Sequence, residues 1–123
     1  MIICDTNIII ELYKNNSQII SELKQIGQEN IVLSAITVAE LYFGALNKTE
    51  LKIIQKDVSP LTVISMNQEV TSTFITLIEK FSLSHRLSIP DAMIAAQAIV
   101  YDYPLFTLNK KDFKFISKLK LYA

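Results

Sequence analysis

The sequence predicts an α/β fold in which helices cover both faces of a parallel sheet. Short apolar runs alternate along the chain with longer segments of helical periodicity, which is the pattern of βαβ units. Most of these runs lack polar alternation, as is typical of strands that are buried on both faces. The 123 residues include two glycines and three prolines, with no low-complexity linker or internal repeat, so we expect one domain spanning residues 1–123.

The apolar runs and the periodic segments place the individual elements. Strands are expected at 2–4, 31–33, 61–64, 104–106 and 119–122. Helices are expected at 8–14, 17–28, 37–56, 67–83 and 90–101, and a short one at 113–117. The segment 37–56 is expected to break near Asn47, and 67–83 is either one helix or the first of two, with a turn around 82–89.

Three short patterns mark the expected helix starts. Thr37 and Glu40 have the spacing of a capping box, in which two side chains satisfy free N–H groups of a first turn. The segment 88–91 places a proline and an acid in a first turn, where both are favoured. Asn109 and Asp112 are expected to open the short helix that follows.

Composition limits the classes of function. With 12 basic and 12 acidic residues, the net charge gives no argument for nucleic-acid binding. The lysine-rich segment 105–123 forms either a solvated face or a modest phosphate-contacting edge. The only cysteine, Cys4, lies in an apolar strand and is expected to be a core residue. A single cysteine cannot form an intrachain disulfide, which fits a reducing compartment. No apolar run reaches the ~18 residues of a membrane span and no signal-like segment is present, so we expect a cytoplasmic protein.

Four acids stand at strand ends or in first helical turns. Asp5 ends the first strand, Glu40 lies in the helix after the second, and Asp112 follows the fourth. Because all strand-to-helix connections of a parallel sheet emerge on one side, we expect these three at one rim. Asp91 opens a helix that precedes a strand, so the topology does not place it, and its convergence with the others is a hypothesis.

Carboxylates that share a site cannot all ionise unless protons or cations compensate their charge. Oxygen ligands without histidine or cysteine select Mg²⁺ or Mn²⁺, a combination that suits phosphodiester hydrolysis. Three of the four acids also have a purely structural alternative role. Glu40 can close the capping box, Asp91 can complement a helix dipole, and Asp112 can cap a helix or lie on the surface. Asp5 has no evident local structural task.

Other residues also have two interpretations. Ser34 and Thr107 end strands and either donate hydrogen bonds to the carboxylates or cap the next element. His85 and Arg86 form a surface turn or contact a phosphate, and the turn is the default. An alanine stripe is expected to pack a helix closely on the sheet, and three apolar residues are assigned to the core by default rather than to a partner surface. The stripe is Ala92, Ala95, Ala96 and Ala98, and the apolar residues are Tyr42, Phe43 and Leu46.

Four segments taken together resemble a known family. They are Ile2-Ile3-Cys4-Asp5-Thr6-Asn7, Leu33-Ser34-x-x-Thr37-x-x-Glu40-Leu41-x-x-Gly44, Pro90-Asp91-Ala92-Met93-Ile94-Ala95-Ala96 and Thr107-Leu108-Asn109-Lys110-Lys111-Asp112-Phe113. In this order and spacing they resemble the motifs of PIN-domain ribonucleases, especially VapC-type toxins of bacterial toxin–antitoxin pairs. The resemblance spans essentially the whole chain.

The resemblance implies a five-stranded parallel sheet in the order 3-2-1-4-5, flanked by helices, and Mg²⁺- or Mn²⁺-dependent endonuclease activity on single-stranded or looped RNA. By position it implies that Asp5 and Asp91 are the central metal ligands and that Glu40 holds metal directly or through water. Asn109 and Asp112 would complete the acidic pocket. Some family members carry an aspartate at the position of Asn109. In this chain Asn109 supplies a neutral oxygen instead, and that makes a second tightly held metal doubtful. The residues implied as hydrogen-bond donors to the ligands are Thr6 and Ser34, and Thr107 is the further candidate named above.

The resemblance also implies a homodimer and an antitoxin that covers the active site and carries the DNA-binding domain. Three alternatives remain open at this point: a PIN nuclease that is not a toxin, an inactive PIN-like binding module, and a haloacid-dehalogenase-like phosphotransferase with Asp5 as nucleophile. The phosphotransferase would have a second aspartate where Asn7 stands.

Overall fold

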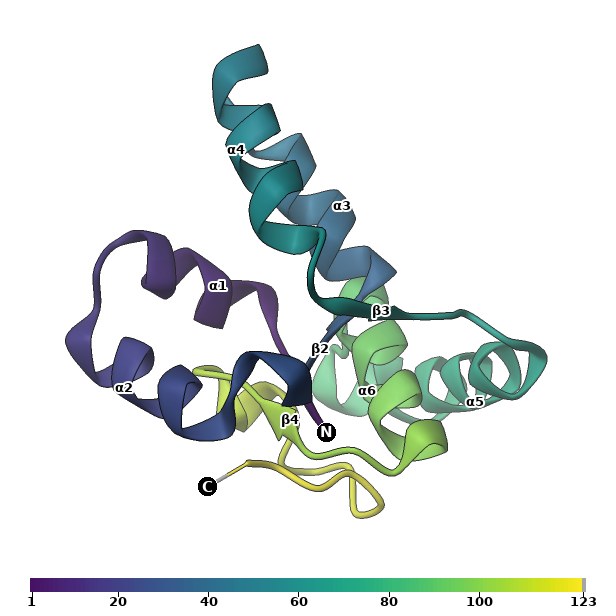
Figure 1. The fold of residues 1–123 in the computed structure, drawn as a ribbon. Coiled ribbons are helices and arrows are strands. Elements are labelled where there is room, and N and C mark those ends of the chain that lie inside the picture. The colour runs from purple at the N-terminus through teal and green to yellow at the C-terminus, as the bar shows by residue number, and fades with distance from the viewer. Residues whose placement is uncertain (123) are drawn as a thin grey trace.

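A four-stranded parallel sheet forms the centre of the computed structural model, which describes residues 1–122 (Figure 1). Its strands are β1 (Ile2–Cys4), β2 (Ile31–Ser34), β3 (Thr62–Ile64) and β4 (Leu105–Phe106), in the order β3-β2-β1-β4. All three pairings are parallel, as the sequence predicts. The central position of β1 places Asp5, the residue after this strand, between the ends of β2 and β4.

Successive residues of the strands face two separate hydrophobic cores. Ile3 is in register with Val32 and Leu105, and all three are fully buried in the first core. Cys4 and Phe106 are also in register, and they point into the second core. Because neighbouring side chains of a strand alternate between faces, both faces of the sheet must be covered by helices.

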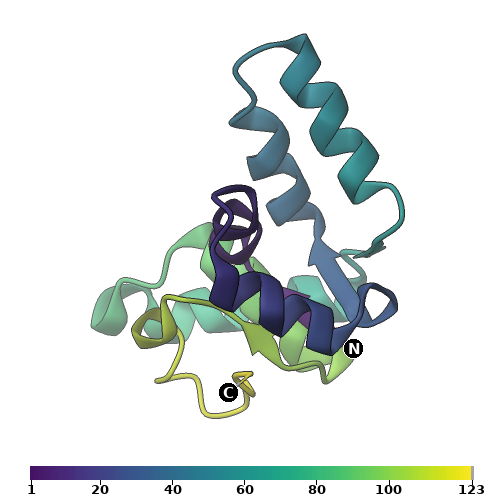
Figure 2. The same cartoon turned by 60° about the vertical axis from the view of Figure 1, so that its left-hand side comes forward.

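Two helices cover the first core, and four contribute to the second. The first core lies under α5 (Gln68–His85) and α6 (Ile89–Tyr101), which pack side by side (Figure 1). The second core takes side chains from α1 (Thr6–Tyr13), α2 (Ser17–Ile26), α3 (Ala35–Phe43) and α4 (Lys48–Val58). Helices α3 and α4 form a hairpin that projects from the rest of the molecule (Figure 2). Short 3₁₀ helices occupy Gln28–Asn30 and Lys110–Asp112.

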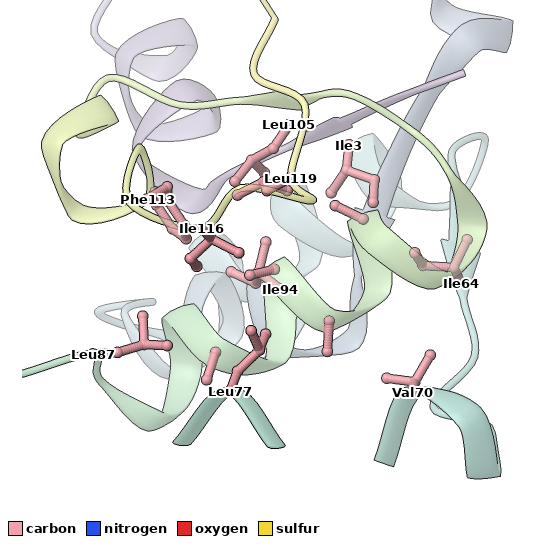
Figure 3. Close-up of a cluster of buried hydrophobic side chains, with 14 of the residues drawn as sticks. Ile3, Ile64, Val70, Leu77, Leu87, Ile94, Leu105, Phe113, Ile116 and Leu119 are labelled. Carbon is pink, nitrogen blue, oxygen red and sulfur yellow. The ribbon is translucent and has the colours of Figure 1, made fainter. Parts of the chain in front are cut away.

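Helix α6 lies at the centre of the first core. Its Ile94 is surrounded by Leu77 of α5 on one side and Ile116 and Leu119 of the C-terminal segment on the other (Figure 3). The predicted close packing of the alanine stripe is confirmed: the four small side chains are almost completely buried, and they are Ala92, Ala95, Ala96 and Ala98. This packing fixes α6, whose first turn carries Asp91, against the sheet.

The predicted break in the segment 37–56 is confirmed. Helix α3 ends at Phe43, and Asn47 caps α4 by accepting a hydrogen bond from the backbone N–H of Glu50 at 2.9 Å. The default assignment of the neighbouring apolar residues to the core is wrong for two of them: Phe43 is 93 % and Leu46 85 % exposed, because both lie at the far end of the hairpin, whereas Tyr42 is half-buried. Helix α5 is a single helix to His85.

The C-terminal segment differs from the prediction in two ways. The expected fifth strand at 119–122 is absent as a strand, and a single parallel bridge between Leu105 and Leu121 takes its place beside β4. The short β4, of two residues, leaves little backbone for further pairing. The expected helix at 113–117 is wrong: the chain forms the 3₁₀ helix at Lys110–Asp112 and then turns, with Phe113 and Ile116 buried in the first core. Ala123, the last residue of the expected domain 1–123, lies outside the described residues. Over residues 1–122, no helix has the length and apolar character to cross a membrane.

The packing of α6 yields a test of the first core. We expect Ile94→Ala to lower the free energy of unfolding by about 2–5 kcal/mol, because it removes a fully packed side chain and leaves a cavity. Ile89→Ala in the same helix is the matched control, since Ile89 is 61 % exposed and its truncation should change stability by no more than about 0.5 kcal/mol. Urea unfolding measures both, and equal losses would contradict this description of the core.

Candidate active site

Asp5 begins the site at the junction of β1 and α1. Its backbone N–H donates to the Phe106 carbonyl oxygen at 2.9 Å, which ties it to β4. Its Oδ1 accepts a hydrogen bond from the Thr6 N–H at 2.8 Å, so that Asp5 is also the N-cap of α1. The expectation that Asp5 lacks a local structural task is therefore wrong. The side chain is only 6 % exposed.

The second oxygen of Asp5 is held by residues from β4 and α1. The hydroxyl of Thr107, 1 % exposed, donates to Asp5 Oδ2 at 2.8 Å and accepts from the Asn109 N–H at 3.1 Å. The Asn7 amide donates to the same Asp5 oxygen at 3.4 Å, and its Oδ1 accepts from the Leu108 N–H at 3.2 Å. Asn7 is a site residue that the sequence pattern does not single out, and its position two residues after Asp5 is the only available signal.

Glu40 joins the site through Thr6 rather than through a capping box. Ser34 caps α3 by accepting from the Ile36 N–H at 3.1 Å, so the helix begins three residues earlier than the capping box requires. The predicted pairing of Thr37 with Glu40 is therefore wrong. Glu40 Oε1 instead accepts a hydrogen bond from the Thr6 hydroxyl at 2.7 Å, and the Thr37 hydroxyl, which is fully buried, lies 3.3 Å from that of Thr6.

Ser34 does not act as the expected donor to a carboxylate. Its hydroxyl is completely buried, and in the described chain its hydrogen bond is the one that caps α3. The alternative role of helix capping is confirmed for this residue. Through that cap, Ser34 sets where α3 starts and hence where Glu40 lies on the helix.

Asp91 stands in the first turn of α6, half-buried. Ser88 is the N-cap of this helix, and its hydroxyl accepts from the Asp91 N–H at 3.3 Å. Burial raises the pKa of Asp91 from 3.8 to about 6, and the negative charge of Asp5 adds to this effect. Smaller repulsions come from Asp112 and Glu40, while the interaction of the Ser88 side chain with the Asp91 carboxyl group lowers the pKa. The hypothesis that Asp91 converges with the other acids is therefore supported by its electrostatics.

The same crowding acts on Asp5. Burial raises the pKa of Asp5 above 3.8, and the charges of Glu40 and Asp112 raise it further. The hydrogen bonds from Thr107 and Thr6 oppose these effects and lower the pKa. None of these four acids forms a salt bridge within residues 1–122, where the ion pairs are Lys14–Glu11 and Lys120–Asp102.

Asn109 and Asp112 lie at the exposed edge of the site. The backbone N–H of Asn109 binds the Thr107 hydroxyl, whereas its side chain makes no capping hydrogen bond to the 3₁₀ helix. Asp112 ends that helix, and its charge raises the pKa of both Asp5 and Asp91. The structure thus brings the Asn109 backbone into the network, while the Asn109 side chain makes no hydrogen bond there among the described residues.

The donor set fits a hard divalent cation, with few direct protein ligands. In the part of the chain that is described, no three acidic, histidine or cysteine side chains are arranged to hold an ion together. Mg²⁺ commonly binds through one or two carboxylates and keeps several waters, so Asp5 and Asp91 form a sufficient pair. Cys4 is excluded as a ligand, since it is fully buried and its pKa is raised to about 12 by burial and by Asp5, which confirms it as a core residue.

The raised pKa of Asp91 yields a prediction about stability. Because the folded-state pKa of about 6 exceeds 3.8, the folded protein holds this proton more tightly than the unfolded chain does. This group therefore lowers the free energy of unfolding as the pH rises from about 4 to about 6. With a chelator present, Asp91→Asn should raise the free energy of unfolding at pH 7, because it removes the cost of ionising this carboxyl group in the folded protein. The full pKa shift corresponds to ~3 kcal/mol, and solvent screening at a half-buried site reduces the expected gain to about 1–2 kcal/mol.

The measurement is urea unfolding at pH 4 and pH 7. At pH 4 the gain from Asp91→Asn should be small, because the carboxyl is then already mostly neutral in the folded protein. Glu79→Gln, which neutralises an exposed acid on α5, is the control and should change stability little at either pH. A loss of stability at pH 7 for Asp91→Asn would contradict the crowding of charge.

Comparison with known proteins agrees with the fold. The PIN domain family matches residues 2–119. A ribonuclease VapC from Rickettsia bellii is 29 % identical, with 98 % of this chain and 93 % of the relative covered.

Two solved structures are similar over nearly their whole length. VapBC-1 from nontypeable Haemophilus influenzae has a chain that is 30 % identical, with a TM-score of 0.84 and coverage of 100 % and 98 %. VapBC2 from Rickettsia felis, bound to a DNA fragment from its promoter, has one that is 28 % identical, with a TM-score of 0.81 and coverage of 99 % and 98 %. The match over residues 2–119 and the fold together show that this chain belongs to the PIN-domain family, and they confirm its resemblance to VapC-type members.

Proposed function

We propose that the protein is a divalent-metal-dependent endoribonuclease and the toxin of a VapBC-like toxin–antitoxin pair. The observation that carries the proposal is the convergence of Asp5, Glu40, Asp91 and Asp112 at one rim of the sheet: burial raises the pKa of Asp91 to about 6, and the charges of the other three acids add to this effect. Crowded carboxylates that form no salt bridge within the described chain are compensated either by protons or by a cation from solution. Membership of the PIN-domain family and likeness to a protein named ribonuclease VapC support RNA as the substrate.

The proposed metal ligands are Asp5 and Asp91, with Glu40 acting directly or through water. Asp112 and Asn109 complete the acidic pocket at its exposed edge. A bound Mg²⁺ or Mn²⁺ supplies positive charge for the phosphoryl oxygens and lowers the pKa of water. The carboxylates fix where that charge is held, and without it they would repel the phosphodiester of RNA.

Positioning of the Asp5 carboxylate is assigned to its neighbours. The Thr6 N–H holds one oxygen, and the Thr107 hydroxyl with the Asn7 amide holds the other. The Thr6 hydroxyl holds Glu40 at the same time, so one residue couples two proposed ligands. Such partners keep ligand oxygens oriented without touching the ion or the substrate.

The proposed partner is an antitoxin protein, and the proposed assembly contains a homodimer of this chain. The similar structures from H. influenzae and R. felis are described as VapBC, and the second is bound to promoter DNA. The formal net charge of zero on this chain favours an antitoxin that contributes the DNA-binding surface. Co-purification with the product of an adjacent small gene, together with loss of RNA cleavage in the complex, tests this assignment.

The phosphotransferase alternative has less support. Residue 7 is an asparagine that binds the Asp5 and Thr107 side chains, so it is a structural partner of Asp5 and supplies no second carboxyl group for general acid catalysis. The presence of all four acids counts against an inactive binding module, which has no need of a cation site. Titration with Mn²⁺ distinguishes that module, because the proposed site binds the ion at millimolar concentration or below.

Loss of a proposed ligand should abolish cleavage. We expect Asp5→Asn and Asp91→Asn each to reduce the rate of RNA cleavage by about 100-fold or more, because each removes charge that holds the ion and stabilises the transition state. Asp102→Asn makes the same chemical change at an exposed site on the far end of α6 and should cleave normally. EDTA should stop the wild-type reaction and Mn²⁺ should restore it. A near wild-type cleavage rate for a folded Asp5→Asn or Asp91→Asn variant would contradict the assignment of these residues as metal ligands.

The positioning role of Thr107 is tested by a matched pair of variants. Thr107→Val keeps the size of the side chain but removes the donor to Asp5 Oδ2, and should lower metal affinity or cleavage by about 10–100-fold. Thr107→Ser retains the hydroxyl and should recover most of the loss. Calorimetric titration with Mn²⁺ and a cleavage assay provide the two readouts. Equal activity of the valine and serine variants would show that the hydroxyl does not position Asp5.

A further inference from the structure

A cavity adjoins the proposed metal site and shares two of its acids. Its volume is about 310 Å³, and Asp91 and Asp112 are among the residues that line it. Arg86, Lys111, His85 and Phe115 also line it. The cavity therefore joins two of the proposed site's acids to the C-terminal end of α5. At the small end of the ~300–1,000 Å³ range of ligand pockets, it suits one nucleotide rather than a longer segment.

Arg86 and Lys111 contribute positive charge to the cavity. Neither forms a salt bridge within residues 1–122. Arg86 follows the last turn of α5 in the left-handed conformation, with φ 55° and ψ 36°, where glycine or asparagine is usually preferred. The buried Leu87, which donates to the Phe81 carbonyl oxygen at 3.3 Å, anchors the chain just after Arg86.

His85 and Phe115 form a stacked pair in the same cavity. Their ring centroids lie 4.1 Å apart and their planes differ by 17°. Phe81 packs edge-on against both rings, at 5.5 Å from His85 and 5.0 Å from Phe115. The Ser84 hydroxyl lies 2.8 Å from His85 Nδ1, so the exposed imidazole is held in one orientation from two sides.

We infer that this cavity binds the nucleotide adjoining the phosphodiester that is cut. Its phosphate lies between Arg86 and Lys111, and its base stacks on the pair formed by His85 and Phe115. This inference rests on the proposed function, and it requires the nucleotide to be unpaired, since a base is free to stack on a side chain only when it is unpaired. The acids take the phosphate that is cut, with its cation, and Arg86 and Lys111 take the neighbouring phosphate.

A protein partner is the competing occupant. An acidic side chain would satisfy Arg86 and Lys111, but it would leave the stacked rings without a role. The combination of two cations with a fixed aromatic pair matches the two parts of a nucleotide, its phosphate and its base. RNA is therefore favoured over an acidic peptide.

The test measures binding of a fluorescent single-stranded oligoribonucleotide by anisotropy, in the Asp5→Asn background with Mg²⁺ so that the RNA stays intact. Arg86→Gly and Lys111→Ala should each weaken binding about 5-fold or more and reduce the slope of log affinity against log salt by about 0.7, as expected for one lost phosphate contact. The melting temperature of Arg86→Gly should be unchanged or higher, because glycine accepts the left-handed conformation. Lys114→Ala, an exposed lysine outside the cavity, is the control and should leave affinity unchanged.

The stacking contact has its own pair of variants. His85→Ala should weaken RNA binding about 5-fold or more, and His85→Phe, which keeps a flat ring, should restore it. A merely structural role of Arg86 would lower the melting temperature together with the affinity. RNA affinities within twofold of the parent for Arg86→Gly and Lys111→Ala would overturn the inference. Polyglutamate is the probe for an acidic peptide, and variants that lose affinity for polyglutamate but not for RNA would also overturn it. If the wild-type chain still cleaves RNA in that case, the proposed function stands and only the subsite fails.

Discussion

The organisation of the site depends on how the charge of Asp5 is accommodated at the end of a strand that is buried on both faces. Hydrogen bonds from Thr6 and Thr107 stabilise the ionised carboxyl, yet burial and the neighbouring acids outweigh them, so its pKa stays above the ordinary value. Asp5 is thus held firmly in place without being fully neutralised. Such a carboxylate is oriented in advance and still lacks a positive charge, which is the condition that a cation site requires.

Three structural junctions bring the remaining groups to this carboxylate. The pairing of β1 with β4 delivers Thr107, the cap of α3 by Ser34 sets the position of Glu40, and the cap of α6 by Ser88 holds the turn with Asp91. Close packing of the α6 alanines on the sheet then leaves little freedom for that turn. The same rigid elements that create the two cores therefore also hold the acids at distances where they repel one another.

Much of this arrangement follows from the sequence, because parallel βαβ units force the ends of successive strands to one rim. That rule places Asp5, Glu40 and Asp112 correctly but is silent on Asp91, whose helix precedes a strand. The start of α3 was open to two caps, Ser34 and Thr37, and the end of β2 decides for Ser34. The same rule places Thr107 after β4, and its expected donation to a carboxylate is confirmed at Asp5. The contact of Asn7 with Thr107, a hundred positions away, is not encoded in local pattern. In the C-terminal segment the local helix signals do not decide between a helix and turns, because tertiary context routinely overrides propensity.

The distance in sequence between Asp5 and its donor has a consequence for biosynthesis. Thr107 is translated 102 positions after Asp5. Domains fold as units during translation, so a nascent chain that ends before β4 cannot assemble the carboxylate network.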